Sequence, residues 1–246
     1  MKLEDVSPAK LYLFSLSTTS IPLPSGQTLD MVLPCYLVET AGGHHILIDS
    51  GIAPDAPCSP QAPPSKGQKT VLDCLSALQL RPEDIDFVIC THFDVDHAGF
   101  HDFFLHSRFV VQRRHYELAR SGDPRFALAR PHWDHPDLRY TLVDGDTELF
   151  PGFTLLETRG HAPGHQSVLL RLPKTGSVLL AIDAVVMEKL FTPERRAWPT
   201  DQDEEQLRAS TRKLLQVTQH ENVSLVVFGH DGKQWQTLRK APEFYD

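Results

Sequence analysis

Short apolar runs rich in β-branched residues recur along the chain, and segments with helical periodicity lie between them. Near-continuous apolar runs of this kind are typical of strands that are buried on both faces of a sheet. The runs that we interpret as strands are CYLVET (35–40), HHILIDSG (44–51), DFVICTH (86–92), RFVVQ (108–112), FTLLETRGH (153–161), SVLLAIDA (177–184) and SLVVFGH (224–230). Strands that alternate with helices predict a layered α/β fold.

Two segments between these runs are expected to be helices. Residues 69–80 place four apolar side chains on one face at helical spacing. Residues 203–220 begin with acidic side chains and carry Lys213 and His220 toward their end, which matches the direction of a helix dipole.

The chain also contains an internal similarity. The two similar units are HHILIDSG–helix–DFVICTH and SVLLAIDA–helix–SLVVFGH. Each unit has a strand that ends in Asp, a helix, and a strand that ends in His. We therefore expect a two-fold pseudo-repeat of strands and helices. Since no linker-like stretch divides the sequence, we expect one domain over residues 1–246.

Composition restricts the class of partner. The 246 residues include 24 Lys and Arg against 32 Asp and Glu, which gives a net charge of −8. This balance argues against a nucleic-acid binder, which usually has a basic face. No stretch approaches the ~18 consecutive apolar residues of a membrane span. The opening MKLEDVSPAK is acidic where a signal peptide becomes apolar. We expect a cytoplasmic protein with no nucleic-acid or membrane partner.

The stretch THFDVDHAGF (91–100) places His92, Asp94, Asp96 and His97 in one short segment. All four side chains can bind a metal ion, and the spacing H-x-D-x-D-H is that of a metal-binding loop rather than of scattered surface histidines. The segment directly follows the strand-like run FVIC.

Three further candidates also follow strand-like runs. His161 follows TLLETRG, Asp183 follows VLLAI and His230 follows LVVFG. Four strands of a sheet would then deliver metal-capable side chains at their carboxyl ends, where α/β folds place their sites. The seven candidates are too many for one catalytic zinc ion, which takes about three protein ligands. They suit two divalent ions that share a carboxylate and lie ~3.5–4 Å apart.

These motifs resemble those of the metallo-β-lactamase superfamily, whose signature is H-x-H-x-D-H followed by three later ligands. Within it, the chain looks like an N-acyl homoserine lactonase. The matching stretches are LPCYLVET, ILIDSG, THFDVDHAGF, VDGDTELFPGFTLLETRGHAPGHQS, LLAIDA and VVFGHD. The resemblance implies an αββα sandwich with a dinuclear metal site at one edge.

The resemblance also implies a ligand set. It assigns one ion to His92, Asp94 and His161, the other to Asp96, His97 and His230, and a bridging position to Asp183. In GHAPGH the second histidine, His165, matches a packing position. Asp49 in LIDSG matches an acid that orients a ligand histidine, with a turn-capping role as the alternative. Zinc is the expected metal, and manganese, iron and cobalt are the alternatives.

The activity implied is opening of the lactone ring of N-acyl homoserine lactones, which are bacterial quorum-sensing signals. A metal-bridging hydroxide would attack the carbonyl carbon, and Asp96 is the candidate for transferring a proton to the leaving group. The expected partner is a small acyl lactone, and the expected assembly is a monomer or homodimer. The alternatives are a thioesterase or other esterase similar to glyoxalase II, a phosphodiesterase, and a metal-binding protein without hydrolytic activity.

Three positions depart from the family pattern. Asp94 replaces a histidine, and a third carboxylate lowers the positive charge of the site and favours harder ions such as Mn²⁺ or Fe²⁺. Val186 lies three residues after Asp183, where the homoserine lactonases usually have a tyrosine that donates to the substrate. Val95 stands where an aromatic residue is common. We therefore expect a more aliphatic pocket near the metals.

The other histidines are not expected to bind metal. PHWDH (131–135) lies among prolines and away from any strand end, so we expect a loop or a pocket rim. His44 and His45 precede a strand and are expected to be solvated. His101 and His106 are expected to be exposed, with a pocket-lining role for one of them as the alternative.

Overall fold

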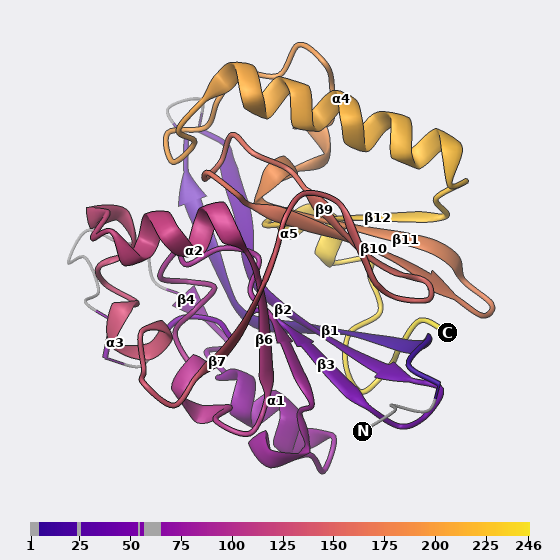
Figure 1. The fold of residues 1–246 in the computed structure, drawn as a ribbon. Helices are drawn as coiled ribbons and strands as arrows, with labels where there is room; N and C mark the ends of the chain where they lie inside the picture. The colour runs from indigo at the N-terminus through magenta and orange to yellow at the C-terminus, as the bar shows by residue number, and fades with distance from the viewer. Residues whose placement is uncertain (1–4, 24–25, 54, 57–64) are drawn as a thin grey trace.

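The structure, a computed structural model, describes residues 5–23, 26–53, 55–56 and 65–246. Two β-sheets pack face to face, and helices cover the outer face of each (Figure 1). The layers therefore run helix, sheet, sheet, helix. The αββα sandwich expected from the sequence is confirmed.

In the described residues, the first sheet has seven strands in the order β4-β1-β2-β3-β5-β6-β7. They are β1 (Pro8–Pro22), β2 (Thr28–Thr40), β3 (His45–Ile48), β4 (Ser65–Lys66), β5 (Phe87–Ile89), β6 (Arg108–Gln112) and β7 (Arg139–Val143). Strands β4, β1, β2 and β3 pair antiparallel, whereas β3, β5, β6 and β7 run parallel. The carboxyl ends of the parallel strands therefore meet at one edge of the sheet.

The second sheet has five strands in the same part of the chain, in the order β12-β11-β10-β9-β8. They are β8 (Thr147–Phe150), β9 (Phe153–Glu157), β10 (Gln166–Leu172), β11 (Gly176–Ile182) and β12 (Leu225–Phe228). β11 and β12 run parallel, and the other pairs are antiparallel. Strands β9, β11 and β12 thus point in one direction.

Helices flank both sheets, and short 3₁₀ turns connect several strands. The helices are α1 (Val71–Ala77), α2 (Arg113–Arg120), α3 (Arg130–Trp133), α4 (Glu204–His220) and α5 (Gly232–Trp235). The 3₁₀ turns are η1 (Pro82–Asp84), η2 (His101–Phe103), η3 (Pro124–Phe126), η4 (Asp183–Val185) and η5 (Glu188–Leu190). None of the helices in the described ranges is long and apolar enough to cross a membrane.

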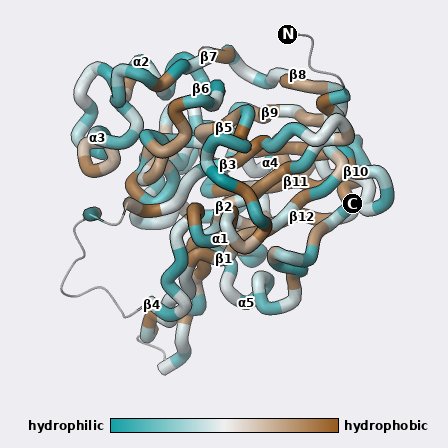
Figure 2. Tube along the Cα trace, turned by 90° about the horizontal axis from the view of Figure 1, so that it is seen from below, coloured by the Kyte–Doolittle hydropathy of each residue, from teal (hydrophilic) through white to brown (hydrophobic). Residues whose placement is uncertain are grey.

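Strand periodicity explains the layers. In β1, Leu11 and Leu13 belong to the apolar cluster between the two sheets, whereas Tyr12 and Phe14 belong to the cluster against α1. Successive side chains of a strand point to opposite faces, so both faces of this sheet are buried. Each fully buried side chain of this size stabilises the fold by about 1.5–3 kcal/mol. Figure 2 shows the hydrophobic segments concentrated along the central strands.

The two helices expected from periodicity are confirmed, and polar side chains mark where each begins. The Thr70 hydroxyl accepts from the amide of Asp73 at 3.1 Å, and the Asp73 carboxylate accepts from the Thr70 amide at 2.7 Å, which is a capping box at the start of α1. The Asp203 carboxylate accepts from the amide of Gln206 at 3.0 Å and caps α4.

The expected pseudo-repeat is visible in the topology. β3, α1 and β5 form one unit with parallel neighbouring strands, and β11, α4 and β12 form the other. The first unit lies in the first sheet and the second unit in the second sheet. Each sheet therefore presents equivalent strand ends to the same region of the molecule.

Two long strands, β1 and β10, were not expected from the sequence. β1 pairs with β2 over most of its length, and its second half alternates half-buried and exposed Ser and Thr side chains. Those side chains lack the apolar signal by which the other strands were recognised, so the pairing with β2 defines this part of the strand.

Candidate metal centre

Four strands end near one another and carry the candidate ligands just beyond their carboxyl ends. The loop after β5 holds residues 92–97, His161 follows β9, Asp183 follows β11 and His230 follows β12. β5 belongs to the first sheet and the other three strands to the second. The expectation that a single sheet supplies all four strands is therefore wrong, and the packing of the two sheets brings the ligands together.

The side chains form two groups, and the ligand atoms of each group lie within 4.8 Å of one another. The groups are His92, His161 and Asp183, and Asp96, His97 and His230. Asp183 also reaches the second group, since its Oδ1 lies 3.0 Å from Nε2 of His230 and its Oδ2 lies 3.7 Å from Nε2 of His97. A carboxylate between two such groups has the geometry of a bridging ligand.

All four histidines of these groups are oriented in the same way, because the Nδ1 atom of each lies beside an oxygen. The partners are Thr91 Oγ1 for His92 (3.0 Å), Asp49 Oδ2 for His97 (2.8 Å), Asp201 Oδ1 for His161 (2.8 Å) and the carbonyl oxygen of Val32 for His230 (2.8 Å). Such a contact fixes the tautomer and turns Nε2 toward the cluster. Metal-binding histidines are typically held in this way.

The donor atoms that face the cluster fit a metal ion. Nε2 of His92 and Nε2 of His97 are buried and make no hydrogen bond within the described residues. Buried polar atoms without a partner are rare, because each costs about 1–3 kcal/mol. Imidazole nitrogens combined with carboxylate oxygens suit zinc and related divalent ions.

The electrostatics of the cluster also suit a cation. Burial raises the pKa of Asp183, but His230 and other neighbouring histidines outweigh burial and hold the pKa well below its usual range. Burial lowers the pKa of His97, but three carboxylates, Asp96 first among them, outweigh burial and raise it well above its usual range. The Asp183 carboxylate is therefore ionised, while His97 would have to release a proton before it could bind a metal.

The backbone before Asp183 is strained. Ile182 has a φ of 50°, in the left-handed region that β-branched residues rarely adopt, at a cost of about 1–3 kcal/mol. A Cβ atom at Gly229 would lie 2.5 Å from the Ile182 carbonyl oxygen and 2.9 Å from Oδ1 of Asp183. Glycine therefore lets the end of β12 approach β11 closely enough for His230 to reach Asp183.

Asp94 lies beside the first group but not within it. Its Oδ2 is 3.1 Å from Nε2 of His161 and 3.4 Å from Nε2 of His92. Both of its oxygens also accept from Arg125, with Nε–Oδ1 at 2.7 Å and Nη2–Oδ2 at 2.5 Å. The ligand role of Asp94 stays a prediction. The expected fall in the charge of the site is offset, because Arg125 compensates the additional carboxylate.

His115 supports the centre, although the sequence indicated no role for it. Its Nε2 accepts from the amide of Phe93 at 2.8 Å, and its Nδ1 donates to the carbonyl of Pro163 at 2.7 Å. It is fully buried, and burial lowers its pKa to about 4, so it is neutral at pH 7. His115 thus joins the loop that carries residues 92–97 to the loop that carries His161.

Asp201 and Arg195 form a second support that the sequence did not reveal. Asp201 contacts Nδ1 of His161 through Oδ1, and its Oδ2 accepts from Nη2 of Arg195 at 3.2 Å and from the Trp198 amide at 2.6 Å. In the sequence, Asp201 is one of several acids before α4 and resembles the capping residue Asp203. No local pattern distinguishes the two.

The two supporting residues that the sequence did indicate lie where expected. Asp49 contacts Nδ1 of His97, as an orienting acid would. His165 lies outside both metal groups, with Nδ1 2.9 Å from Oγ1 of Thr158 and Nε2 accepting from the amide of Asp183 at 3.3 Å. It packs behind Asp183.

Several expectations for the remaining histidines are wrong. The expectation of a loop is wrong for residues 131–133, which belong to α3, and no residue of 131–135 is among the described residues that line the cavity below. His132 lies 3.0 Å from Asp102 and 3.1 Å from Asp55. The expectation of exposure is confirmed for His106 but wrong for His101, which is fully buried.

His44 and His45 are half-buried rather than solvated. Nδ1 of His44 lies 3.3 Å from Asp86, and Nδ1 of His45 lies 3.1 Å from the carbonyl oxygen of Asp84. The segment just before β5 provides both contacts, because β3 and β5 are neighbouring strands.

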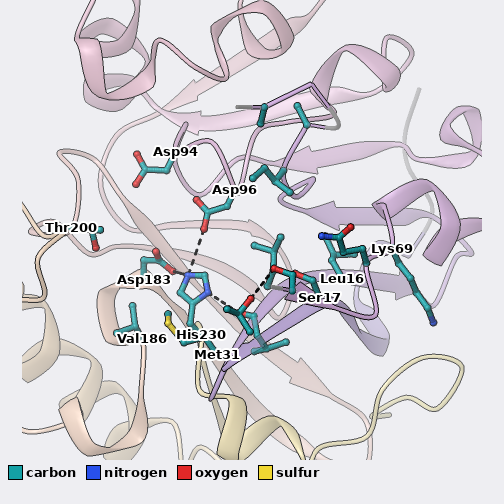
Figure 3. A pocket seen from close by; sticks show the side chains of 18 of the residues that line it. Leu16, Ser17, Met31, Lys69, Asp94, Asp96, Asp183, Val186, Thr200 and His230 are labelled. Carbon is teal, nitrogen blue, oxygen red and sulfur yellow. Dashed lines mark hydrogen bonds and ion pairs between the residues drawn. The ribbon is translucent and has the colours of Figure 1, made fainter. Parts of the chain in front are cut away.

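A cavity of about 740 Å³ opens beside the two groups. Figure 3 shows Asp94, Asp96 and Asp183 on one side of it and Leu16 and Ser17 on the other. Much of the remaining wall is aliphatic, with side chains from β1, β2 and the segment after β3. The cavity has the form expected for a ligand with an apolar tail and a polar reacting group.

Val186 and Val95, the two valines that depart from the family pattern, lie in different surroundings. Val186 lines the cavity and is buried, as expected for a wall residue near the metals. Val95 is half-buried and is not among the lining residues in the described part of the chain. Only Val186 therefore makes the pocket more aliphatic.

Comparison with known proteins identifies relatives. The metallo-beta-lactamase superfamily model matches residues 33–230. The chain is 32% identical to an N-acyl homoserine lactonase of a Bacillus species, with 96% of each chain covered. It is 30% identical to the N-acyl homoserine lactonase AttM of Rhizobium radiobacter, with 90% of each covered.

A solved structure shares the fold. It is that of an N-acyl homoserine lactone hydrolase with the product N-hexanoyl-L-homoserine bound at the catalytic metal centre. The TM-score is 0.83 at 29% identity, and the match covers 97% of this chain and 100% of that one.

Proposed function

Since the chain belongs to the metallo-β-lactamase superfamily, and within it to the family of the N-acyl homoserine lactonases, we propose that it hydrolyses the lactone ring of N-acyl homoserine lactones. The observation that carries the proposal is the pair of His and Asp groups at the wall of a largely aliphatic cavity. The groups would act on the ring, and the cavity would hold the acyl chain.

The proposed enzyme uses two divalent metal ions, with zinc as the first choice. His92, His161 and Asp94 would hold one ion, Asp96, His97 and His230 the other, and Asp183 would be shared. When bound, such ions supply hydroxide near neutral pH and polarise the carbonyl oxygen of an ester. The Nε2 atoms of His92 and His97, which are buried and make no hydrogen bond within the described residues, support this assignment.

The residues of the chain then have distinct tasks. The aliphatic wall, including Val186, binds the acyl chain and excludes water from it. Asp96 is the most exposed acid of the two groups, with a third of its side chain accessible, and it lines the cavity. It is therefore suited to transfer a proton to the alkoxide that leaves when the ring opens.

One apolar cluster spans both sheets and supports a single domain over residues 1–246. We also propose that the enzyme acts on a small molecule and exists as a monomer or a homodimer.

The test is hydrolysis of lactones with acyl chains of increasing length by protein of measured metal content. We expect the ring-opened acid, detected by proton release, and loss of activity after chelation with recovery on adding metal. His106→Ala, a change of an exposed histidine, is the matched control and should behave as the parent protein. Faster turnover of thioesters or phosphodiesters by orders of magnitude would contradict the lactonase assignment.

A further inference from the structure

Arg125, in the turn η3, extends its guanidinium group into the candidate metal centre. Nε and Nη2 donate to the two oxygens of Asp94 at 2.7 and 2.5 Å. Nη1 donates to the carbonyl oxygens of His161 at 3.0 Å and Thr200 at 2.9 Å. Only 17% of the side chain is exposed. Hydrogen bonds to Asp94, His161 and Thr200 therefore fix the position of the guanidinium group.

The contacts of Arg125 include atoms that a metal ion would use. Nη2 lies 2.5 Å from Oδ2 of Asp94 and 2.9 Å from Nε2 of His161. Those two acceptors are themselves 3.1 Å apart. Nδ1 of His161 is occupied by Asp201, so Nε2 is the nitrogen that His161 has available for either the metal or Arg125.

Within the described residues, the second group has no such contact. The charged partners of Asp96, His97 and His230 in the described residues are carboxylates and histidines, with no arginine or lysine among them. A fixed positive charge a few ångströms from a divalent ion weakens binding, and a fork that satisfies both oxygens of a carboxylate competes with coordination. The two metal positions therefore differ in their surroundings.

We propose that Arg125 is a built-in competitor for one of the two metal positions, so that the ions bind in sequence. The position formed by Asp96, His97 and His230 with Asp183 fills first and tightly. The position formed by His92, Asp94 and His161 with Asp183 fills second and more weakly, because the incoming ion must share or displace the contacts of Arg125. Asp94 and Arg125 form one unit, in which the arginine compensates the carboxylate that replaces a histidine.

This inference deepens the proposed metal centre and does not depend on the substrate. Metal affinity is measured without lactone. A protein that binds two ions in sequence but opens no lactone would support the inference and overturn the proposed function. A lactonase with two equivalent metal positions would do the reverse.

The test is titration of metal-free protein with Co²⁺, followed by visible absorption and by competition with a chelator of known affinity. The parent protein should show two separated dissociation constants. Arg125→Met removes the charge and keeps an aliphatic stem, so it should tighten the weaker position at least ten-fold and leave the tighter position unchanged. Arg125→Lys, which keeps the charge without the fork, should give an intermediate value.

Arg113→Met is the matched control, because Arg113 also forms a pair with an aspartate, Asp144, but at an exposed position. It should leave both constants unchanged. Circular dichroism and a melting curve verify that each variant is folded. Unchanged constants in Arg125→Met, or weaker binding at the second position, would overturn the proposal, since either result means that Arg125 does not compete with the metal.

A double-mutant cycle tests the unit directly. Asp94→His alone should weaken the second position, because it leaves the Arg125 charge without its carboxylate. Asp94→His combined with Arg125→Met should bind the second ion more tightly than the sum of the two single effects on the binding free energy predicts, because the penalty of Asp94→His depends on the Arg125 charge. Additive effects of the two substitutions would show that the residues act independently and would overturn the proposed unit.

Discussion

Oδ2 of Asp49 lies 2.8 Å from Nδ1 of His97, although 48 residues separate the two in the chain. The same oxygen accepts from the hydroxyl of Thr91 at 2.7 Å, and that hydroxyl lies 3.0 Å from Nδ1 of His92. One buried carboxylate thus orients two candidate metal ligands, one directly and the other through a threonine. The ligands after β5 are consequently fixed by the end of β3.

Asp49→Asn should weaken metal binding by about 10–100-fold, because an amide lacks the negative charge that favours the required tautomer of His97. Chelator competition measures the change. Asp86→Asn is the matched control, since Asp86 also lies beside a histidine, 3.3 Å from Nδ1 of His44, but just before β5 and outside both metal groups. Equal metal affinity in Asp49→Asn and the parent would show that Asp49 is structural only.

Asp183→Ala should abolish activity and lower the metal content at both positions, because its two oxygens reach both groups. Elemental analysis and the rate of lactone hydrolysis measure the two effects. Loss of only one equivalent of metal would argue against a shared carboxylate.

His165→Ala should retain nearly the full metal content, since His165 contacts the amide of Asp183 rather than its carboxylate. It should lower the free energy of unfolding by about 1–3 kcal/mol, because buried partners lose their hydrogen bonds. Chemical denaturation gives this value. A metal content reduced as much as in Asp183→Ala would instead identify His165 as a ligand.

His101→Leu should make the protein more resistant to acid. His101 is fully buried, and neither ring nitrogen has a hydrogen-bond partner among the described residues. Burial lowers its pKa from 6.5 to about 3. As the pH falls, His101 is therefore protonated in the unfolded chain before it is protonated in the folded protein. The free energy of unfolding falls as the pH drops from about 6.5 toward 3.

Leucine cannot take up a proton, so the variant should avoid this loss, which amounts to about 2 kcal/mol at pH 5. Urea denaturation at pH 7 and pH 5 compares the two proteins. The expected result is a smaller decrease for the variant, with similar stability at pH 7. An identical decrease in both would contradict a neutral, buried His101.

Metal binding should release protons at neutral pH. Burial lowers the pKa of His230, but Asp183 outweighs burial and raises it, and the pKa of His97 is raised further by its own carboxylate neighbours. Because the metal binds neutral imidazole, apparent affinity should fall as the pH drops below these raised pKa values. Calorimetry in buffers of different ionisation enthalpy counts the protons. No release at pH 7 would show that both rings are already neutral.

The sequence by itself predicted strands that alternate with helices and the residues of the candidate centre, while the family resemblance implied the four layers. Buried strands and amphipathic helices have local periodicity, and a strand that ends in His or Asp is visible without any knowledge of its neighbours. The similarity between the strand–helix–strand units that contain α1 and α4 could be recognised for the same reason. The second half of β1, which is rich in Ser and Thr, could not, since its stability depends on pairing with β2.

Only the tertiary structure decided which residues support the centre and how its charge is balanced. Arg125 is 31 positions from Asp94, and Asp201 is 40 positions from His161. A charged residue that will be buried in a pair has no periodicity that separates it from one on the surface. Its partner is set by how the segments after β5, α2, β9 and β11 pack together. The charge that the sequence adds at Asp94 is therefore compensated by a contact that exists only in the folded chain.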